Sequence, residues 1–151
     1  MKKRIWLLPL LILTSVLLTG CALQTVNEMY ALPKRSKEYD SLQSAIDSAM
    51  YGLSYSAPVS GENQQTVQMA DLDGDGVEEY IVFAQGSSSN PLQVLIFRQE
   101  EDGTCRLMEV IQSNGSAFEQ VEYVQMDDAP GYELVVGRQL SDQVLRSVSV
   151  Y

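Results

Sequence analysis

The chain has 151 residues, of which 45% are apolar, enough for one domain with a modest core and too many for wholesale disorder. Without residues 1–20, the chain has seven basic and twenty acidic side chains. We expect no nucleic-acid partner, because a body this acidic repels phosphates. The chain has no histidine, which excludes His-based catalytic triads, HExxH metalloproteases and most zinc sites.

Residues 1–20 have the plan of a secretory signal. Basic residues 2–4 precede an apolar run that is shorter than the ~20 residues of a membrane-spanning helix, although an uncleaved anchor is the alternative. The ending Leu18-Thr19-Gly20-Cys21 resembles the bacterial lipobox. This resemblance implies cleavage before Cys21 and lipidation of its thiol. We therefore expect an extracytoplasmic protein that is lipid-anchored to the bacterial membrane through Cys21.

Residues 21–35 show no sustained periodicity and are expected to form a tether. The segment 36–53 has apolar residues at helical spacing, with Gly52 as a stop signal, so it predicts one amphipathic helix. We favour a helix that packs its apolar stripe on a sheet over one that offers the stripe to a partner. A polar link then leads to the first strand of a β region that spans residues 64–151.

The segment 71–79 has acidic residues at relative positions 1, 3, 5 and 9 around two glycines. Side chains at alternate positions of a tight turn can converge on a hard cation such as Ca²⁺, which takes six to eight oxygen ligands. The glycines are expected to supply the positive φ angles that close such a turn. The predicted ligands are the side chains of Asp71, Asp73, Asp75 and Glu79 and the carbonyl of Val77. A tight turn that binds no metal is the alternative.

This loop is not an EF-hand, because position 12 is Val82 rather than glutamate and both flanking segments have strand composition. A strand, an acidic loop and an apolar strand in this order resemble the FG-GAP (VCBS-type) repeats of integrin-α-like β-propellers and bacterial surface proteins. The resemblance implies that the loop carries calcium. Glu79 departs from the family pattern, which more often has aspartate at that position.

A displacement of 54 residues gives an ungapped self-match that includes Asp73 with Asp127 and Glu79 with Glu133. The first copy, about residues 64–117, contains four expected strands, and the second, about 118–151, is truncated and lacks the fourth. The second loop keeps Asp127 and Glu133 but has lost two of the four acidic ligands and gained Pro130, so we expect no calcium there. The fold class is therefore mainly β, with blade-like antiparallel sheets preceded by one helix. It forms either a small two-sheet domain or part of an incomplete propeller.

The function expected from these features is calcium-dependent binding or scaffolding at the cell surface, without enzymatic activity. The expected partner is a protein or a glycan of the cell envelope. The alternatives are a carbohydrate-binding module that uses tyrosines such as Tyr132, and a glycosidase-type accessory domain that uses paired carboxylates such as Glu119 and Glu122. Cys105 has no histidine to act as its base, so it is interpreted as a small strand residue.

Overall fold

The structure is a computed structural model that describes residues 36–140 and 146–151. Its single described helix, α3 (Lys37–Ala49), begins at Ser36, whose side chain accepts a hydrogen bond from the N–H of Tyr39 at 3.2 Å. The helix ends before residue 53, the expected boundary, because the chain turns at Met50 and reaches positive φ at Gly52. The predicted amphipathic helix is thus present but four residues shorter at its C-terminal end.

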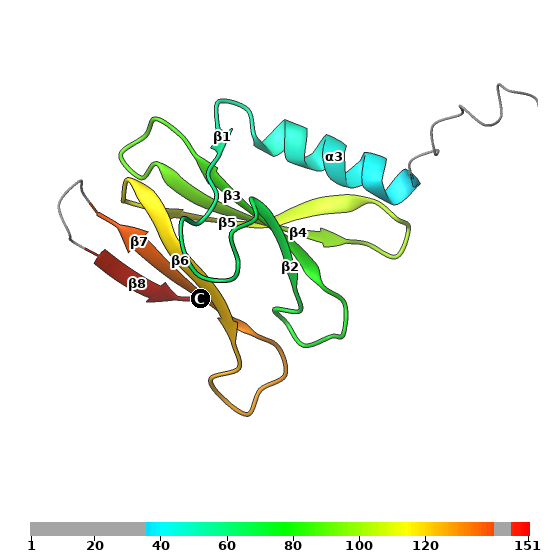
Figure 1. The fold of residues 1–151 in the computed structure, drawn as a ribbon. Coiled ribbons are helices and arrows are strands. Elements are labelled where there is room, and N and C mark those ends of the chain that lie inside the picture. Colours follow the sequence, from blue (N-terminus) through cyan, green and yellow to red (C-terminus); the bar gives the residue numbers. More distant parts are fainter. Residues whose placement is uncertain (1–35, 141–145) are drawn as a thin grey trace, which may run out of the picture. The chain divides into compact units, whose positions relative to one another are not determined.

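Two antiparallel sheets follow the helix (Figure 1). The first sheet contains β1 (Ser54–Tyr55), β2 (Val67–Ala70), β3 (Glu79–Gln85), β4 (Leu92–Gln99) and β5 (Cys105–Ser113). The second sheet contains β6 (Ala117–Val124), β7 (Glu133–Gln139) and β8 (Arg146–Val150). A mainly β fold is therefore confirmed, and the described residues form no closed barrel or propeller.

The 54-residue displacement relates β2, β3 and β4 of the first sheet to β6, β7 and β8 of the second, whereas β1 and β5 have no equivalent among the described strands of the second sheet. It carries the bounds of β3 onto those of β7, and it carries the pairing of Val67 with Val82 onto that of Val121 with Val136. The β3–β4 pairing is reproduced between β7 and β8 in the same register. The repeat seen in the sequence is thus also a repeat of hydrogen-bonded structure.

The core lies in two layers, one on each face of the first sheet. Between the sheets, Phe83 meets Phe118 edge to face, with ring centroids 5.1 Å apart. On the opposite face, Ile46 of α3 packs on Val82 and Phe97. The helix therefore covers the first sheet, as its apolar stripe predicted, and the first sheet lies between α3 and the second sheet (Figure 1).

Corresponding faces of the two sheets point in the same direction. Val82 faces the helix, whereas its equivalent Val136 faces the first sheet. Phe83 faces the second sheet, and its equivalent Gly137 lies on that sheet's outer face. The layers are therefore stacked head to tail. The helix covers the Val82 face of the first sheet, and the first sheet covers the equivalent Val136 face of the second.

The polar link between residues 54 and 65 has a structural role that its composition did not reveal. Its first two residues form β1, which pairs with the end of β3. Further along, the N–H of Val59 donates to the carbonyl of Phe118 at 3.1 Å and that of Ser60 to the carbonyl of Glu119 at 2.8 Å. The link therefore joins the two sheets by backbone hydrogen bonds at the edge strand β6.

Candidate metal centre

The segment 71–79, here called the first loop, connects β2 to β3 and is closed by its own carboxylates. Asp71 accepts backbone hydrogen bonds from Gly74 at 2.7 Å and Gly76 at 3.0 Å, one on each oxygen. Both glycines have positive φ, 76° and 86°, which confirms the predicted conformation. The glycines thus let the chain fold around Asp71, which lies at the centre of the turn.

Three of the five predicted ligands come together. One carboxylate oxygen from each of Asp71, Asp73 and Glu79 lies within 4.8 Å of the other two, and these three side chains are called the acidic cluster below. Asp75 lies outside this group, and its Oδ1 accepts a hydrogen bond from the N–H of Val77 at 2.7 Å. The roles predicted for Asp75 and for the Val77 carbonyl therefore stay predictions.

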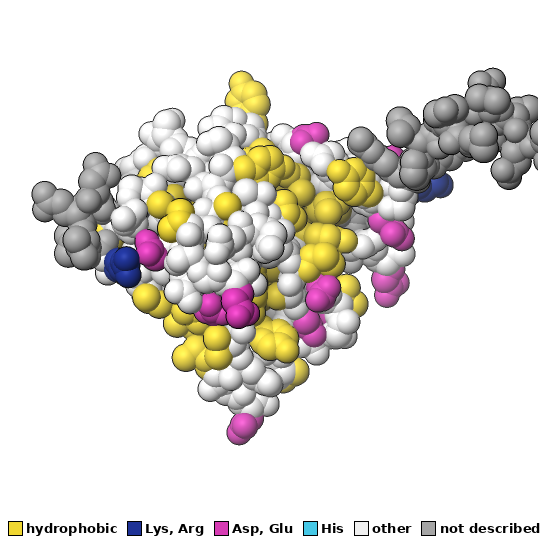
Figure 2. Space-filling view, in the orientation of Figure 1, with side chains coloured by type: hydrophobic (Ala, Val, Ile, Leu, Met, Phe, Trp, Pro, Cys, Tyr) yellow, Lys and Arg dark blue, Asp and Glu magenta, His cyan; other side chains and the backbone are white. Residues whose placement is uncertain are grey.

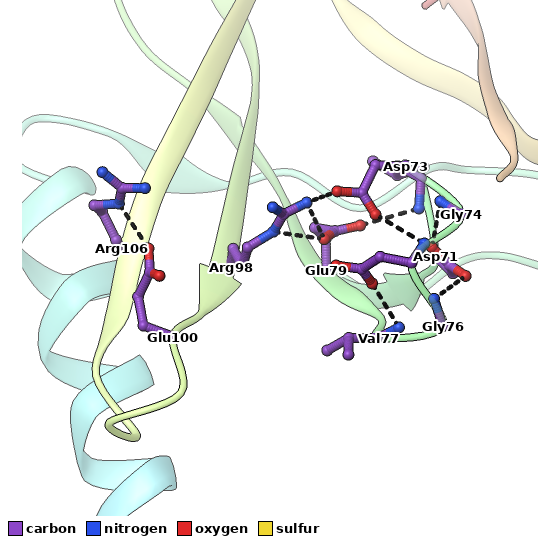
Figure 3. Close-up of polar contacts among 11 residues, drawn as sticks. Asp71, Asp73, Gly74, Gly76, Val77, Glu79, Arg98, Glu100 and Arg106 are labelled. Carbon is purple, nitrogen blue, oxygen red and sulfur yellow. Dashed lines mark hydrogen bonds and ion pairs between the residues drawn. The ribbon is translucent and has the colours of Figure 1, made fainter. Parts of the chain in front are cut away.

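Arg98 enters the acidic cluster from β4 (Figure 3). Its Nε and Nη2 each donate to Glu79 Oε1 at 3.0 Å, and Nη2 also forms an ion pair with Asp73 Oδ2. The sequence interpretation missed this residue because it lies 19 positions after Glu79. The register of β3 and β4 was the signal that could have found it. In this antiparallel ladder, Glu79 and Arg98 occupy the position next to the pair Tyr80–Phe97.

Glu79 is the most buried member of the acidic cluster, with 3% of its surface exposed. Burial raises the pKa of its carboxyl, and the nearby charges of Asp75 and Asp71 raise that pKa further. The N–H of Leu72, which donates to the carboxylate at 3.0 Å, stabilises the anion and partly offsets this rise in pKa. A second positive charge beside Arg98 would favour the ionised form. The electrostatics therefore suit an added cation.

The residues present fit a divalent cation in charge and ligand type. Three carboxylates and one guanidinium leave two negative charges uncompensated, which one divalent cation would neutralise. Each carboxylate oxygen that accepts one hydrogen bond keeps a further lone pair for a metal. Oxygen is also the ligand that Ca²⁺ and Mg²⁺ prefer. The cluster can hold a metal ion, although these properties do not distinguish one hard cation from another.

The second loop, residues 125–133, retains part of the first loop's geometry. In the first loop the N–H of Leu72 donates to Glu79, and in the second loop the N–H of Met126 donates to the equivalent Glu133 at 2.8 Å. Likewise, the N–H of Asp75 donates to Asp73, and the N–H of Ala129 donates to the equivalent Asp127 at 2.7 Å.

The second loop also packs on the first. The N–H of Tyr132 donates to the carbonyl of Asp71 at 2.9 Å, and a Cβ on Gly74 would lie 2.4 Å from the carbonyl carbon of Pro130. The substitutions that removed ligands from the second copy have therefore left a loop that supports the candidate site of the first.

A cavity of about 380 Å³ adjoins the acidic cluster and is lined by Arg98, Tyr132 and Tyr151, among others. Tyr132 and Tyr151 are both half-exposed there. Tyr80 instead packs with the helix layer, and the Tyr123 hydroxyl donates to Gln68 at 2.7 Å, where burial raises its pKa. Tyr132, the tyrosine named for a carbohydrate site, thus lies at a cavity together with Tyr151, whereas Tyr80 and Tyr123 are structural.

The carboxylates proposed for a glycosidase-type site lie on the second sheet. Glu119 forms an ion pair with Arg146 at 3.1 Å, and Glu122 accepts a hydrogen bond from Gln120 at 2.8 Å. A bulge between Phe118 and Gln120 interrupts the alternation of β6, and both glutamates line one cavity of about 280 Å³ on the outer face.

The two cysteines lie in different parts of the chain. Cys21 lies outside the described residues. Cys105 is a half-buried free cysteine at the start of β5, where burial raises its thiol pKa and its N–H donates to Ser41 of α3 at 2.8 Å. This environment suits a structural residue.

The 13-residue α3 is too short to span a bilayer, and the part of the chain that the structure describes contains no candidate membrane span.

Comparison of the chain with protein-family models, with curated proteins and with solved structures finds no match. The resemblance to FG-GAP repeats therefore rests on the first loop and on the strand order alone.

Proposed function

We propose that this protein is a lipid-anchored, extracytoplasmic domain in which Ca²⁺ bound at the first loop stabilises a surface for binding or scaffolding. The observation that carries the metal assignment is the convergence of Asp71, Asp73 and Glu79 with two uncompensated negative charges. Calcium is the proposed ion because this arrangement of acids between two strands is the one that resembles FG-GAP loops. Calcium is also abundant outside cells, where a loop of modest affinity can be occupied.

The surface of the described residues supports a partner other than nucleic acid. Figure 2 shows acidic side chains at several points on one face, with few basic ones among them. Such a surface repels phosphate backbones. We therefore propose a protein or a glycan of the cell envelope as the partner, and a role in binding rather than catalysis.

Calcium is expected to raise the melting temperature of the mature lipidated protein, residues 21–151, in detergent. For a Kd of ~0.3 mM, within the extracellular range, 10 mM calcium adds about 2 kcal/mol of stability because only the folded state has the site. For a chain of this size the midpoint should rise by roughly 4–8 °C. Differential scanning calorimetry in CaCl₂ and in EGTA measures the shift.

The repeat supplies a matched control for this experiment. Asp73→Ala should abolish the calcium response, whereas Asp127→Ala, at the equivalent position of the second loop, should leave it intact. Magnesium should have a smaller effect, because it requires a tighter octahedral shell. Identical melts of the unmodified protein in calcium and in EGTA would refute the metal assignment and leave the first loop as a hydrogen-bonded turn.

Cys21→Ala is expected to release or mislocalise the protein, because a thioether lipid requires that sulfur. Labelled fatty acid fed to the producing bacteria should appear on the unmodified protein and not on the variant. Cys105→Ala is the control and should keep the label. A Cys21→Ala protein that still carries label and still sediments with membranes would contradict the proposed anchor.

A further inference from the structure

The hydrogen bonds to the acidic cluster come from two kinds of donor. The carboxylate of Asp71 accepts from the backbone N–H groups of Gly74 and Gly76, and Glu79 Oε2 accepts from the N–H of Leu72. These donors belong to the fold of the first loop and cannot withdraw without opening it. Arg98 reaches its partners through a long side chain from the neighbouring strand β4. Among the described residues, Arg98 is thus the donor that can leave while the loop keeps its shape.

The guanidinium occupies one oxygen of each of two carboxylates in the acidic cluster. Arg98 engages Glu79 Oε1 with two nitrogens and contacts Asp73 Oδ2 with one of them. The side chain of Glu79 is only 4% exposed, so its charge is poorly screened, whereas that of Arg98 is 30% exposed and can turn toward solvent. A cation that binds Asp73 and Glu79 must therefore displace the guanidinium or bind beside its positive charge, and both reduce affinity.

We propose that Arg98 is a resident counter-ion of the acidic cluster, which competes with the metal for Asp73 and Glu79 and thereby sets a low affinity. This inference rests on the metal assignment proposed above and adds a residue to it. When the metal is scarce, Arg98 compensates part of the carboxylate charge and keeps the first loop folded. When the metal is abundant, it binds, but the free energy gained on binding is reduced by the interactions that Arg98 loses. The domain is therefore expected to fold with or without the ion.

Arg98→Gln tests the competition, because glutamine can still donate to Glu79 but carries no charge. Calorimetric titration of the mature lipidated protein in detergent with CaCl₂ should show binding about tenfold tighter or more in this variant than in the unmodified protein. In EGTA the variant should melt at a lower temperature, because the buried Glu79 has lost its counter-charge. Calcium should raise the melting temperature of Arg98→Gln by more than it raises that of the unmodified protein.

Two further variants separate charge from folding. Arg106→Gln is the matched control, because Arg106 forms a 2.9 Å ion pair with Glu100 on the same β4–β5 hairpin, away from the cluster (Figure 3). It should leave the calcium affinity unchanged. Arg98→Lys keeps the charge but loses the two-pronged contact, so its affinity should lie between those of the unmodified protein and Arg98→Gln. This variant also provides the test if Arg98→Gln does not fold.

The outcomes distinguish the two proposals. If the unmodified protein binds calcium and removal of the Arg98 charge leaves the affinity equal or weaker, the competition is refuted and the metal site stands. If neither the unmodified protein nor the Arg98 variants bind calcium, both proposals fail. If binding is detected only when the Arg98 charge is removed, the competition is supported and is stronger than expected.

Discussion

Phe83→Ala is expected to destabilise the domain by about 3–5 kcal/mol, the usual cost of truncating a fully buried phenylalanine. Phe83 has no exposed surface, and its ring meets that of Phe118 across the interface of the two sheets. The loss should lower the midpoint of urea unfolding without a large change in the slope. The experiment therefore measures how strongly the two sheets depend on each other.

Val148→Ala is the control for this prediction. Val148 lies on the outer face of the second sheet with 66% of its surface exposed, so its truncation should change stability by no more than about 0.5 kcal/mol. A cost below about 1 kcal/mol for Phe83→Ala would contradict the two-sheet core. The sheets would then fold as units that hardly interact.

Gly74→Ala is expected to cost about 2–5 kcal/mol and to weaken the calcium response. Gly74 has a φ of 76°, where a side chain is strained by about 1–2 kcal/mol. Its Cβ would also lie 2.4 Å from the backbone of Pro130, so one loop must move away from the other, with a cost of about 1–3 kcal/mol. Thermal melts in EGTA and in calcium would measure both effects.

Gly76→Ala separates strain from contact. Gly76 has a similar φ of 86°, but a Cβ there would have no atom within 4 Å. It should therefore cost only the strain, about 1–2 kcal/mol. The difference between the two variants reports the contact of the first loop with the second. Equal costs would show that the second loop does not support the first.

Local sequence patterns predicted the local features of this fold. Periodicity located α3, and runs of strand composition bounded by turn residues located β2 to β5, because these elements are specified by residues close together in the chain. The positive φ of Gly74 and Gly76 was predictable for the same reason. The 54-residue self-match also located the strands of the second sheet, since a repeated pattern implies a repeated register.

The features that depend on tertiary contacts were not predictable in the same way. The segment 71–79 contains no basic residue, yet Arg98 from β4 forms ion pairs with both Asp73 and Glu79. The contact of Pro130 with Gly74 depends on how the two sheets stack, which neither loop specifies alone. Composition likewise described residues 54–65 as a polar link and did not reveal their pairing with both sheets.

The head-to-tail stacking of the two sheets means that their strands are not interchangeable, although their registers coincide. If residues 79–85 replaced residues 133–139, Val82 would enter the position of Val136 and remain buried. Ile81 and Phe83 would enter the positions of Val135 and Gly137, on the outer face of the second sheet. Such a chimera would keep every strand pairing and present two large apolar side chains to water, a surface prone to self-association.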